Sequence, residues 1–285
     1  MINIVVTSKP VDGLLYYSYE YCDILNKAGV PAQVVIISHR KFNQQEYIDV
    51  LKTKYTTYEK VLIDTYLPSE NDVTLIMGRS MMTLSWQNFN NYTNHQQRCL
   101  RKLFSSNVIS VYSENHPVDY QKSVKFYSPR HIVNLCDTAV YPNGIGEHFE
   151  KHINFDIYKP YVDDQKFRYL FLGTNDKYYA AAESVLHKYP DHGILTYQAS
   201  YVNLKNRNIF VPISNLMGLF DTYVYTKATF DPAPRIIQEC KYFDKNIIYE
   251  RDNKIVDGGS VYWRRDIKKP DILPILNALG ELNEN

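Results

Sequence analysis

The residues best suited to chemistry lie in the stretch from Asp221 to Arg251. Arg235 follows a proline-rich loop at the start of a predicted helix, and Glu239 comes four residues later. A helix N-terminus with a cation beside it favours an anion such as a diphosphate. Because residues four apart share one face of a helix, Glu239 can accept hydrogen bonds from a ribose diol beside that anion. The alternative is an ordinary Arg–Glu pair on a solvated helix face.

A second candidate site combines a carboxylate and an imidazole, Glu114 and His116. Both follow the apolar run Val108–Tyr112, which is typical of a buried parallel strand. Ligands of open α/β sheets bind beyond the carboxyl ends of the strands, so either side chain could act as a general base there. The alternative is a polar loop at a strand end that carries no chemistry.

A third candidate is the glycine that directly follows the predicted strand Phe167–Leu172. Gly173 lets the backbone come close to a phosphate group. We expect Thr174 and Lys177, which come just after it, to contact the same phosphate.

Two strand–loop–helix–strand patterns position these residues. The chain opens with an apolar strand, Ile2–Thr7, followed by a helix, Leu14–Lys27, and a second strand, Ala32–Ser38. The second pattern runs from Tyr223–Tyr225 through the Arg235 helix to Asn246–Tyr249. Such units build doubly wound parallel sheets, so the sequence predicts an α/β fold with two Rossmann-like domains. The first loop lacks G-x-G-x-x-G, which argues against a dinucleotide site.

The remaining elements follow from periodicity. Further strands are predicted at Lys60–Asp64, Val73–Met77, Val108–Tyr112, His131–Leu135, Ala139–Tyr141, Gly193–Tyr197 and Asn208–Val211. Further helices are predicted at Gln44–Tyr55, Asn94–Phe104, Tyr178–Lys188, Ser214–Phe220 and Ile272–Leu282.

Composition limits the possible partners. The chain has 285 residues, 45% of them apolar, and a net charge of +1, so no global basic bias points to nucleic acid. The helix Asn94–Phe104 is locally basic, with Arg98, Arg101 and Lys102, and could contact an acidic acceptor such as DNA. The alternative is a solvated face. The 26 tyrosines suit stacking on bases or sugars, although biased codon usage would also produce them.

Cysteine and hydropathy patterns indicate the compartment. The four cysteines are far apart and form no CxxC motif, which argues against structural zinc and disulfides. The N-terminus shows no secretory leader, and no apolar run approaches the roughly 18 residues that span a bilayer. We therefore expect a cytoplasmic, monomeric protein that does not enter a membrane.

The pattern around Arg235 and Glu239 resembles the nucleotide-sugar-binding core of glycosyltransferases with the GT-B fold. That fold has two Rossmann-like domains facing across a cleft. The resemblance implies that Glu239 binds the donor ribose, that Arg235 binds its phosphates, and that the Gly173 loop approaches the donor. The commonest pattern of the family has a Glu seven residues before the ribose Glu. Here Pro232 stands at that place, which argues against the retaining, saccharide-polymerising members.

The same resemblance implies a division of the chain. Residues 1–160 would form the acceptor domain and residues 161–285 the donor domain, with a hinge near Tyr158–Gln165 and a final helix returning towards the first domain. Backbone groups at Ile213 would meet the donor's base. The remaining loop positions that could touch donor or acceptor are Asp12, Gly13, Asp257, Gly258 and Gly259. The last three read by default as a hairpin turn.

A narrower resemblance concerns VISVYSENHPVDYQKS, from Val108 to Ser123. It is similar to the strand and loop that carry the catalytic Asp of phage DNA β-glucosyltransferases, which modify 5-hydroxymethylcytosine. Glu114 stands at the position of that catalytic Asp, so the residue here is also acidic but is a different amino acid.

The two resemblances together imply inverting transfer from a nucleoside-diphosphate sugar, UDP-linked, to a hydroxymethylated pyrimidine in double-stranded phage DNA. This would take place in the host cytoplasm, with Glu114 as base and His116 second to it. A GT-B reaction requires no protein-bound metal or other cofactor. Two alternatives stay open: a glycosyltransferase for a glycan or surface polysaccharide, and a non-catalytic nucleotide- or sugar-binding protein.

Overall fold

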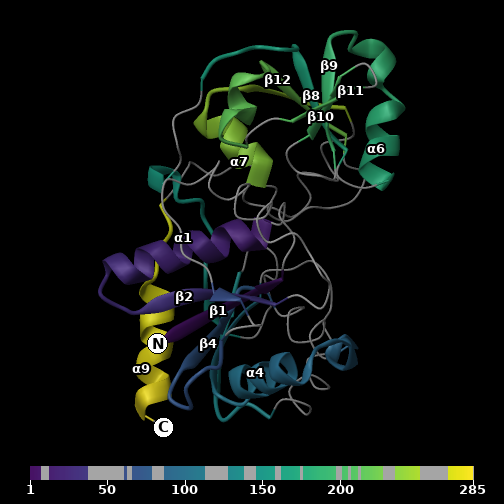
Figure 1. Ribbon diagram of the computed structural model, residues 1–285. Helices are drawn as coiled ribbons and strands as arrows, with labels where there is room; N and C mark the ends of the chain where they lie inside the picture. Colours follow the sequence, from purple (N-terminus) through teal and green to yellow (C-terminus); the bar gives the residue numbers. More distant parts are fainter. Residues whose placement is uncertain are drawn as a thin grey trace. The chain divides into compact units, whose positions relative to one another are not determined.

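The computed structural model shows a mixed α/β protein (Figure 1). It describes residues 1–7, 13–37, 61–62, 66–78, 87–112, 128–137, 146–157, 162–173, 176–196, 201–204, 207–210, 213–226, 235–250 and 269–284. The predicted helix Gln44–Tyr55 and the predicted strand Ala139–Tyr141 lie outside these residues.

The chain divides into two compact units. Unit 1 comprises Met1–Phe42, Tyr58–Ile153 and Lys269–Asn285, and the described residues of unit 2 fall within Asn154–Lys268. Within unit 2, the ring of Phe155 stacks on that of Tyr242, with centroids 3.9 Å apart and planes 3° from parallel.

Unit 1 contains a parallel sheet. The strands in its described part are β1 (Ile2–Thr7), β2 (Ala32–Ile37), β3 (Val61–Leu62), β4 (Val73–Ile76), β5 (Asn107–Tyr112), β6 (Ile132–Cys136) and β7 (Glu147–His148). Their order is β3-β2-β1-β4-β5-β6-β7, and each neighbouring pair is parallel. The first six strands therefore have the 3-2-1-4-5-6 order of the doubly wound dinucleotide-binding fold.

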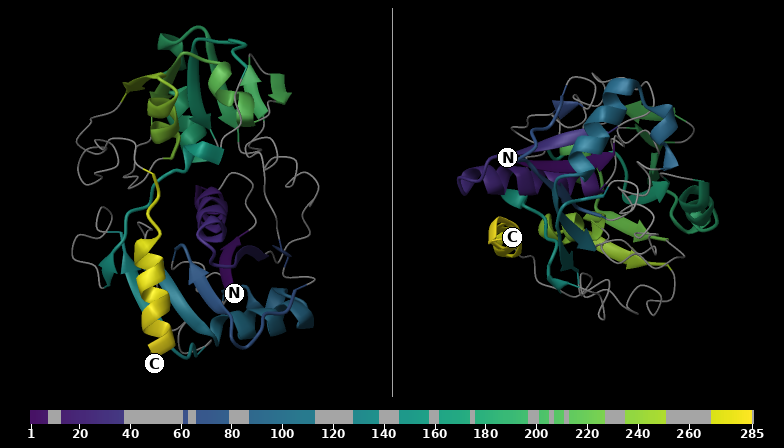
Figure 2. Two further views of the ribbon diagram at one scale, coloured as in Figure 1. Left: turned by 90° about the vertical axis from the view of Figure 1, so that its left-hand side faces the viewer. Right: turned by 90° about the horizontal axis from the view of Figure 1, so that it is seen from below.

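Helices cover both faces of this sheet. The helix α1 (Gly13–Lys27) connects β1 to β2 and packs on both, while α4 (Asn94–Phe104) precedes β5 and lies on the other side (Figures 1 and 2). Leu100 and Leu103 of α4 belong to the same buried apolar cluster as Val5 of β1. The final helix α9 (Leu273–Glu284) packs against β5 and β6 and so belongs to unit 1.

Local sequence explains where these helices begin and end. Thr93 and Gln96 form a capping box at the start of α4, because each side chain accepts a hydrogen bond from the other's backbone N–H. The helix α1 ends before Gly29, whose φ of +81° belongs to the left-handed region that glycine adopts without strain.

Unit 2 contains a second sheet. Its described strands are β8 (Tyr169–Gly173), β9 (His192–Thr196), β10 (Tyr201–Leu204), β11 (Arg207–Phe210), β12 (Thr222–Tyr225) and β13 (Asn246–Tyr249), in the order β11-β10-β9-β8-β12-β13. The neighbouring strands β9, β8, β12 and β13 pair in parallel. The strand β10 is antiparallel to both β9 and β11. The sequence predicted β11 but missed β10, because the Lys205–Asn206 connection lacks the usual hairpin glycine.

The two helices of unit 2 nearest the parallel strands cover opposite faces. The helix α6 (Asp176–Glu183) packs through Ala182 and Tyr179 on Phe171 and Val224. The helix α7 (Arg235–Tyr242) packs instead on the face that carries Leu170, Tyr223 and Tyr225. Since successive strand residues point to opposite faces, this split shows a doubly wound arrangement.

Two predicted helices of unit 2 differ in type or length. The stretch predicted as one helix from Tyr178 to Lys188 consists of α6 and a separate 3-10 turn, Leu186–Lys188. Lys188, the last residue of that turn, and Tyr189, which follows it, both donate hydrogen bonds to the carboxylate of Glu250. The predicted helix Ser214–Phe220 is a 3-10 segment, Ile213–Gly218. Among the described residues, no helix is both long enough and apolar enough to span a membrane.

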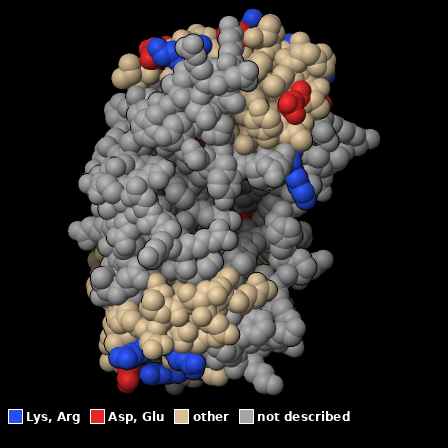
Figure 3. Space-filling model, turned by 45° about the vertical axis from the view of Figure 1, so that its right-hand side comes forward, with Lys and Arg blue, Asp and Glu red and all other residues tan. Residues whose placement is uncertain are grey.

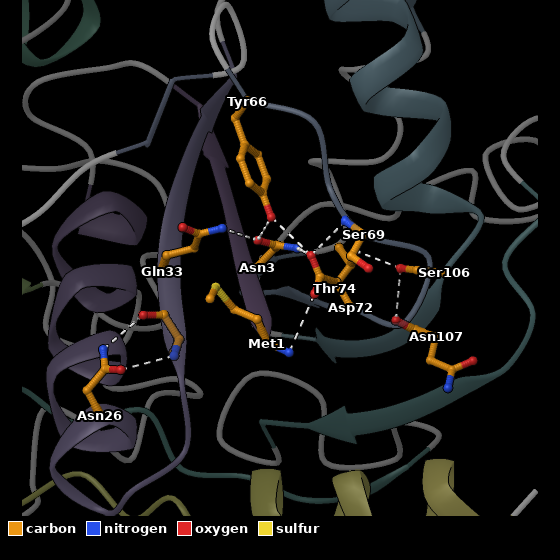
Figure 4. A network of polar contacts seen from close by, with 11 residues as sticks. Met1, Asn3, Asn26, Gln33, Tyr66, Ser69, Asp72, Thr74, Ser106 and Asn107 are labelled. Atoms are coloured by element: carbon orange, nitrogen blue, oxygen red, sulfur yellow. Dashed lines mark hydrogen bonds and ion pairs between the residues drawn. The ribbon is translucent and has the colours of Figure 1, made fainter.

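A polar network joins the amino ends of β1 and β4 in unit 1 (Figure 4). The Oδ2 atom of Asp72 accepts hydrogen bonds from Asn3 Nδ2 at 3.1 Å, Tyr66 OH at 3.0 Å and the Ser69 backbone N–H at 3.0 Å. The N-terminal ammonium of Met1 lies 3.5 Å from Oδ1. Burial alone would raise the pKa of Asp72, but these donors outweigh burial, so its pKa lies below the usual value. Burial and the bond to Asp72 raise the pKa of Tyr66 to about 12.

Replacing Asp72 with Asn should lower the free energy of unfolding by about 1–3 kcal/mol at pH 7, because the carboxylate accepts several hydrogen bonds. Since folding lowers the Asp72 pKa, this stabilisation is present above the unfolded value of 3.8 and is lost as the pH falls through the folded value. Urea unfolding at pH 7 and below pH 4 measures both effects.

Asp164 provides the matched control, because its ion pair with Lys166 is exposed. Asp164→Asn should change the free energy of unfolding by less than about 1 kcal/mol. A cost of Asp72→Asn that does not shrink in acid would contradict the charged-acceptor interpretation.

Candidate functional site

The strand order of unit 2 reverses direction between β8 and β12. From β8 the chain continues through α6 to β9 on one side, and from β12 it continues through α7 to β13 on the other. The strands β8 and β12 are parallel neighbours, so their carboxyl ends lie at the same sheet edge. Ligands of doubly wound sheets bind beyond the carboxyl ends at such a topological switch point. The candidate site of unit 2 lies at this edge.

Gly173 is the last residue of β8 and is buried. A Cβ atom placed there would lie 2.5 Å from Ile194 Cγ2 and 3.2 Å from Tyr179 Cδ2. The packing of β9 and α6 against the end of β8 therefore accounts for a glycine at this position by itself, whether or not a ligand binds there. The approach of a phosphate to this backbone stays a prediction. Lys177, in the first turn of α6, is exposed at the same edge.

Arg235 and Glu239 form a buried ion pair at the start of α7. The Nε atom of Arg235 donates to Glu239 Oε1 at 3.0 Å, and each side chain is only 8% exposed. The alternative of a solvated surface pair is therefore wrong. Removing two charges from water costs several kcal/mol for each ion, and an apolar pair of similar volume is often as stable. Such a pair is a better indication of function than of stability.

The two faces of α7 differ in character. The face on the sheet consists of Ile236, Ile237, Cys240 and Phe243. By helical periodicity, Arg235, Gln238 and Glu239 lie on another side, yet all three are less than 10% exposed. Sequence reasoning missed Gln238, although its spacing of three residues from Arg235 places it on the same side of the helix.

Two of the weaker predicted positions are described by their backbone. Gly13 is the first residue of α1, after the carboxyl end of β1, and Ile213 begins the 3-10 segment that precedes β12. The other predicted site residues lie outside the described part of the chain: Glu114, His116, Asp12, Thr174, Asp257, Gly258 and Gly259. The strand β5, which precedes Glu114, ends at Tyr112.

Unit 1 holds a second group of buried polar side chains. Glu20 of α1 and Asp137, which directly follows β6, have no exposed surface. Burial first, and then the charges of Tyr17, Glu20 and Asp137, raise the pKa of Tyr21 well above its usual value. Tyr21 OH donates to the backbone oxygen of Glu150 at 3.2 Å. This hydrogen bond joins α1 to the segment after β7. Because the carboxylates of Glu20 and Asp137 are enclosed, they offer no surface to a ligand.

Metal ligands and disulfides were also sought in the described residues. That part of the chain contains no group of His, Cys, Asp and Glu side chains that could hold a metal ion. Cys22, Cys99, Cys136 and Cys240 are free thiols there. Burial raises the pKa of Cys99 to about 12 and that of Cys240 well above its usual value, so neither thiol is a ready nucleophile.

No protein-family model matches the sequence, and a search of the curated proteins finds no match.

Removing one member of the buried pair should destabilise the protein strongly. Glu239→Ala leaves the Arg235 guanidinium buried without its carboxylate, so we expect the free energy of unfolding to fall by about 3–5 kcal/mol. The double variant Arg235→Met/Glu239→Leu should recover most of that loss, because it removes both charges and keeps apolar volume. Urea unfolding of the three proteins measures these differences.

The i,i+4 pair of Asp23 and Lys27 on α1 is the control, since its Lys is 66% exposed. Asp23→Ala should cost less than about 1 kcal/mol. If Glu239→Ala costs no more than Asp23→Ala, burial does not decide the energetics of the Arg235 pair.

Proposed function

We propose that the protein is a glycosyltransferase that takes its sugar from a nucleoside-diphosphate donor, UDP-linked, and transfers it with inversion to a hydroxymethylated pyrimidine in DNA. The observation that carries this proposal is the buried Arg235–Glu239 pair. It stands on the helix that follows β12, next to the switch point between β8 and β12.

The donor interactions follow from the chemistry of this edge. The guanidinium of Arg235 and the positive end of the α7 helix dipole both favour a diphosphate. The carboxylate of Glu239 can accept hydrogen bonds from the two ribose hydroxyls. Lys177 adds an exposed positive charge at the start of α6. One sheet edge thus offers cations for the phosphates and an acceptor for the ribose.

The transfer step needs a base and a stabilised leaving group. In the proposal, Glu114 removes the proton of the acceptor hydroxymethyl group, and the resulting oxygen attacks the anomeric carbon from the side opposite the diphosphate. The bond between the anomeric carbon and the phosphate oxygen breaks, and the diphosphate leaves with the electron pair. Arg235 stabilises the charge that develops on it. Attack from the opposite side inverts the configuration.

Two features support the GT-B arrangement and the DNA acceptor in this proposal. Each unit is a compact α/β body with a sheet of largely parallel strands, as the GT-B fold requires. On α4, Arg98 and Arg101 are exposed and could contact DNA phosphates. Among the residues coloured in Figure 3, charges of both signs lie near one another on the face drawn. DNA binding would therefore depend on local contacts such as those of α4.

A donor-hydrolysis and transfer screen tests the function. The full chain is incubated with UDP-, GDP- and dTDP-sugars, alone and with duplexes that contain cytosine or 5-hydroxymethylcytosine. We expect one donor to be consumed fastest with the hydroxymethylated duplex, and the product DNA to gain the mass of one sugar per modified base. Transfer to a glycan acceptor instead would overturn the DNA assignment. Donor binding without turnover under any condition would leave a non-catalytic binding protein.

Glu114→Gln should lower kcat by roughly 10²–10⁴-fold and leave donor affinity unchanged, because it keeps the size of the side chain and removes its basicity. His116→Ala should cost less, since His116 only orients the acceptor in this proposal. Steady-state kinetics and calorimetry separate the two effects. An inactive His116→Ala beside an active Glu114→Gln would reverse the two roles.

A further inference from the structure

The side of α4 that faces away from the sheet carries three cations. Arg98 and Arg101 are exposed, and Lys102 is half-buried. Their spacings of three and four residues place them on one side of the helix. The opposite side is buried through the apolar residues Cys99, Leu100, Leu103 and Phe104. A well-packed helix therefore holds the three charges at fixed positions on the surface of unit 1.

Arg130 adds a fourth cation to this group. It is exposed and comes two residues before β6. Its backbone N–H donates to the oxygen of Ser106 at 3.2 Å, and the N–H of Ser105 donates to the oxygen of Arg101 at 3.0 Å. Since Ser105 and Ser106 link α4 to β5, the fold brings Arg130 to the C-terminal end of α4.

No described carboxylate pairs with these four cations. Within the described part of the chain none of them makes an ion pair, whereas the exposed Lys27 and Lys166 each pair with a nearby Asp. The stretches 87–112 and 128–136 contain no Asp or Glu. Before the neighbouring strand β4, Asp72 is already bonded to the network at β1, and Glu70 is exposed. The acidic residues of α9 belong to a helix on the other side of the sheet (Figures 1 and 2).

Structural roles account for only part of this group. Cations in the last turn of a helix are favoured by its dipole, which applies to Arg101 and Lys102. The guanidinium of Arg101 also lies 4.9 Å from the centre of the Phe89 ring, over its face. Neither reason applies to Arg98, in the middle of α4, or to Arg130, which precedes a strand. Cations gathered on one surface are the electrostatic footprint of a polyanion-binding site.

Strand direction separates this group from the place of the proposed transfer. The strands β5 and β6 pair in parallel from Val108 and Ile132 onwards, so Arg130 and the end of α4 lie at the amino edge of the sheet. Glu114, the proposed base, follows the carboxyl end of β5. A strand of six residues spans about 20 Å. The cations are therefore too far from that edge to touch the base pair that is modified.

We propose that Arg98, Arg101, Lys102 and Arg130 form an anchor surface that binds the phosphate backbone of the acceptor DNA away from the transfer site; this inference rests on the proposed function. Arginine binds phosphate through paired N–H donors, and such contacts hold a duplex without reading its sequence. With about 3.4 Å per base pair, a duplex that meets both places extends at least about six base pairs from the modified base.

Binding of unmodified DNA tests the anchor surface directly. Fluorescence anisotropy follows a labelled duplex of about 30 base pairs over a range of salt concentrations, with wild type and with Arg98→Gln/Arg130→Gln. Glutamine keeps helix propensity and removes the charge. Since each phosphate contact adds about 0.9 to the slope of log K against log salt, we expect the double variant to lower that slope by about 2. Its affinity should fall about tenfold or more.

Matched variants separate the anchor surface from net charge and from folding. Lys27→Gln/Lys166→Gln removes two exposed charges elsewhere and should stay within about twofold of wild type. Arg98→Lys/Arg130→Lys keeps both charges and should keep most of the affinity. Thermal unfolding checks that every variant is folded. Where the double Gln variant does not fold, Arg130→Gln alone should lower the slope by about 1.

Dependence on duplex length tests the separation from the transfer site. Transfer is measured on duplexes of about 10 and about 30 base pairs, each with 5-hydroxymethylcytosine at its centre. The ends of the short duplex lie only about 17 Å from the modified base, so it does not reach the anchor surface. We expect Arg98→Gln/Arg130→Gln to raise KM about tenfold on the long duplex, and to leave kcat on both duplexes and KM on the short one unchanged.

The outcomes separate the inference from the function on which it rests. Equal losses on both duplexes place the cations at the transfer site and overturn the separate anchor. Wild-type binding of long DNA by the double Gln variant leaves a solvated helix face and overturns the inference, while the proposed function stands. Binding of wild type to phosphatidylserine vesicles but to no duplex overturns both the inference and the DNA acceptor. Weakened DNA binding by the Gln variant of a protein that consumes no nucleotide sugar supports the anchor surface and overturns the proposed function.

Discussion

Parallel pairing of neighbouring strands is the constraint on which both units depend. Parallel strands cannot be joined by a tight turn, so each connection passes over a face of the sheet, usually as a helix. In unit 2 this sends the chain from β8 through α6 along one face and from β12 through α7 along the other. The divergence of these two connections creates the switch point at the carboxyl edge. The proposed donor site is thus a consequence of the topology.

The same constraint explains the close packing around Gly173. Where β8 ends, the side chains of Ile194 and Tyr179 approach the glycine from β9 and α6. Tight contact between helix and strand at this point keeps the N-terminus of α6 near the sheet edge. A larger residue would force those two side chains apart. The glycine therefore serves the site by setting the geometry of the edge, whether or not its backbone touches a phosphate.

The polar side of α7 carries the function that we propose. Three polar side chains within five residues, Arg235, Gln238 and Glu239, are buried although the helix packs on the sheet through other residues. Burying charges and amides opposes folding unless they are paired, and Arg235 and Glu239 pair with each other at 3.0 Å. A diphosphate at the helix N-terminus would add a partner for the guanidinium.

The sequence by itself determined the elements whose signals are local. An apolar run defined β1 from Ile2 to Thr7, and 3.6-residue periodicity defined α4 from Asn94 to Phe104. Pro234 marked the start of α7, and the β-branched and aromatic residues Ile247, Ile248 and Tyr249 marked β13. Whether Arg235 and Glu239 are solvated or buried, and that Gln238 shares their environment, was decided only by tertiary structure. Sequence spacing places residues on one side of a helix, but burial depends on what packs against that side. The β10–β11 hairpin was likewise settled by pairing with β9, a contact that no local pattern encodes.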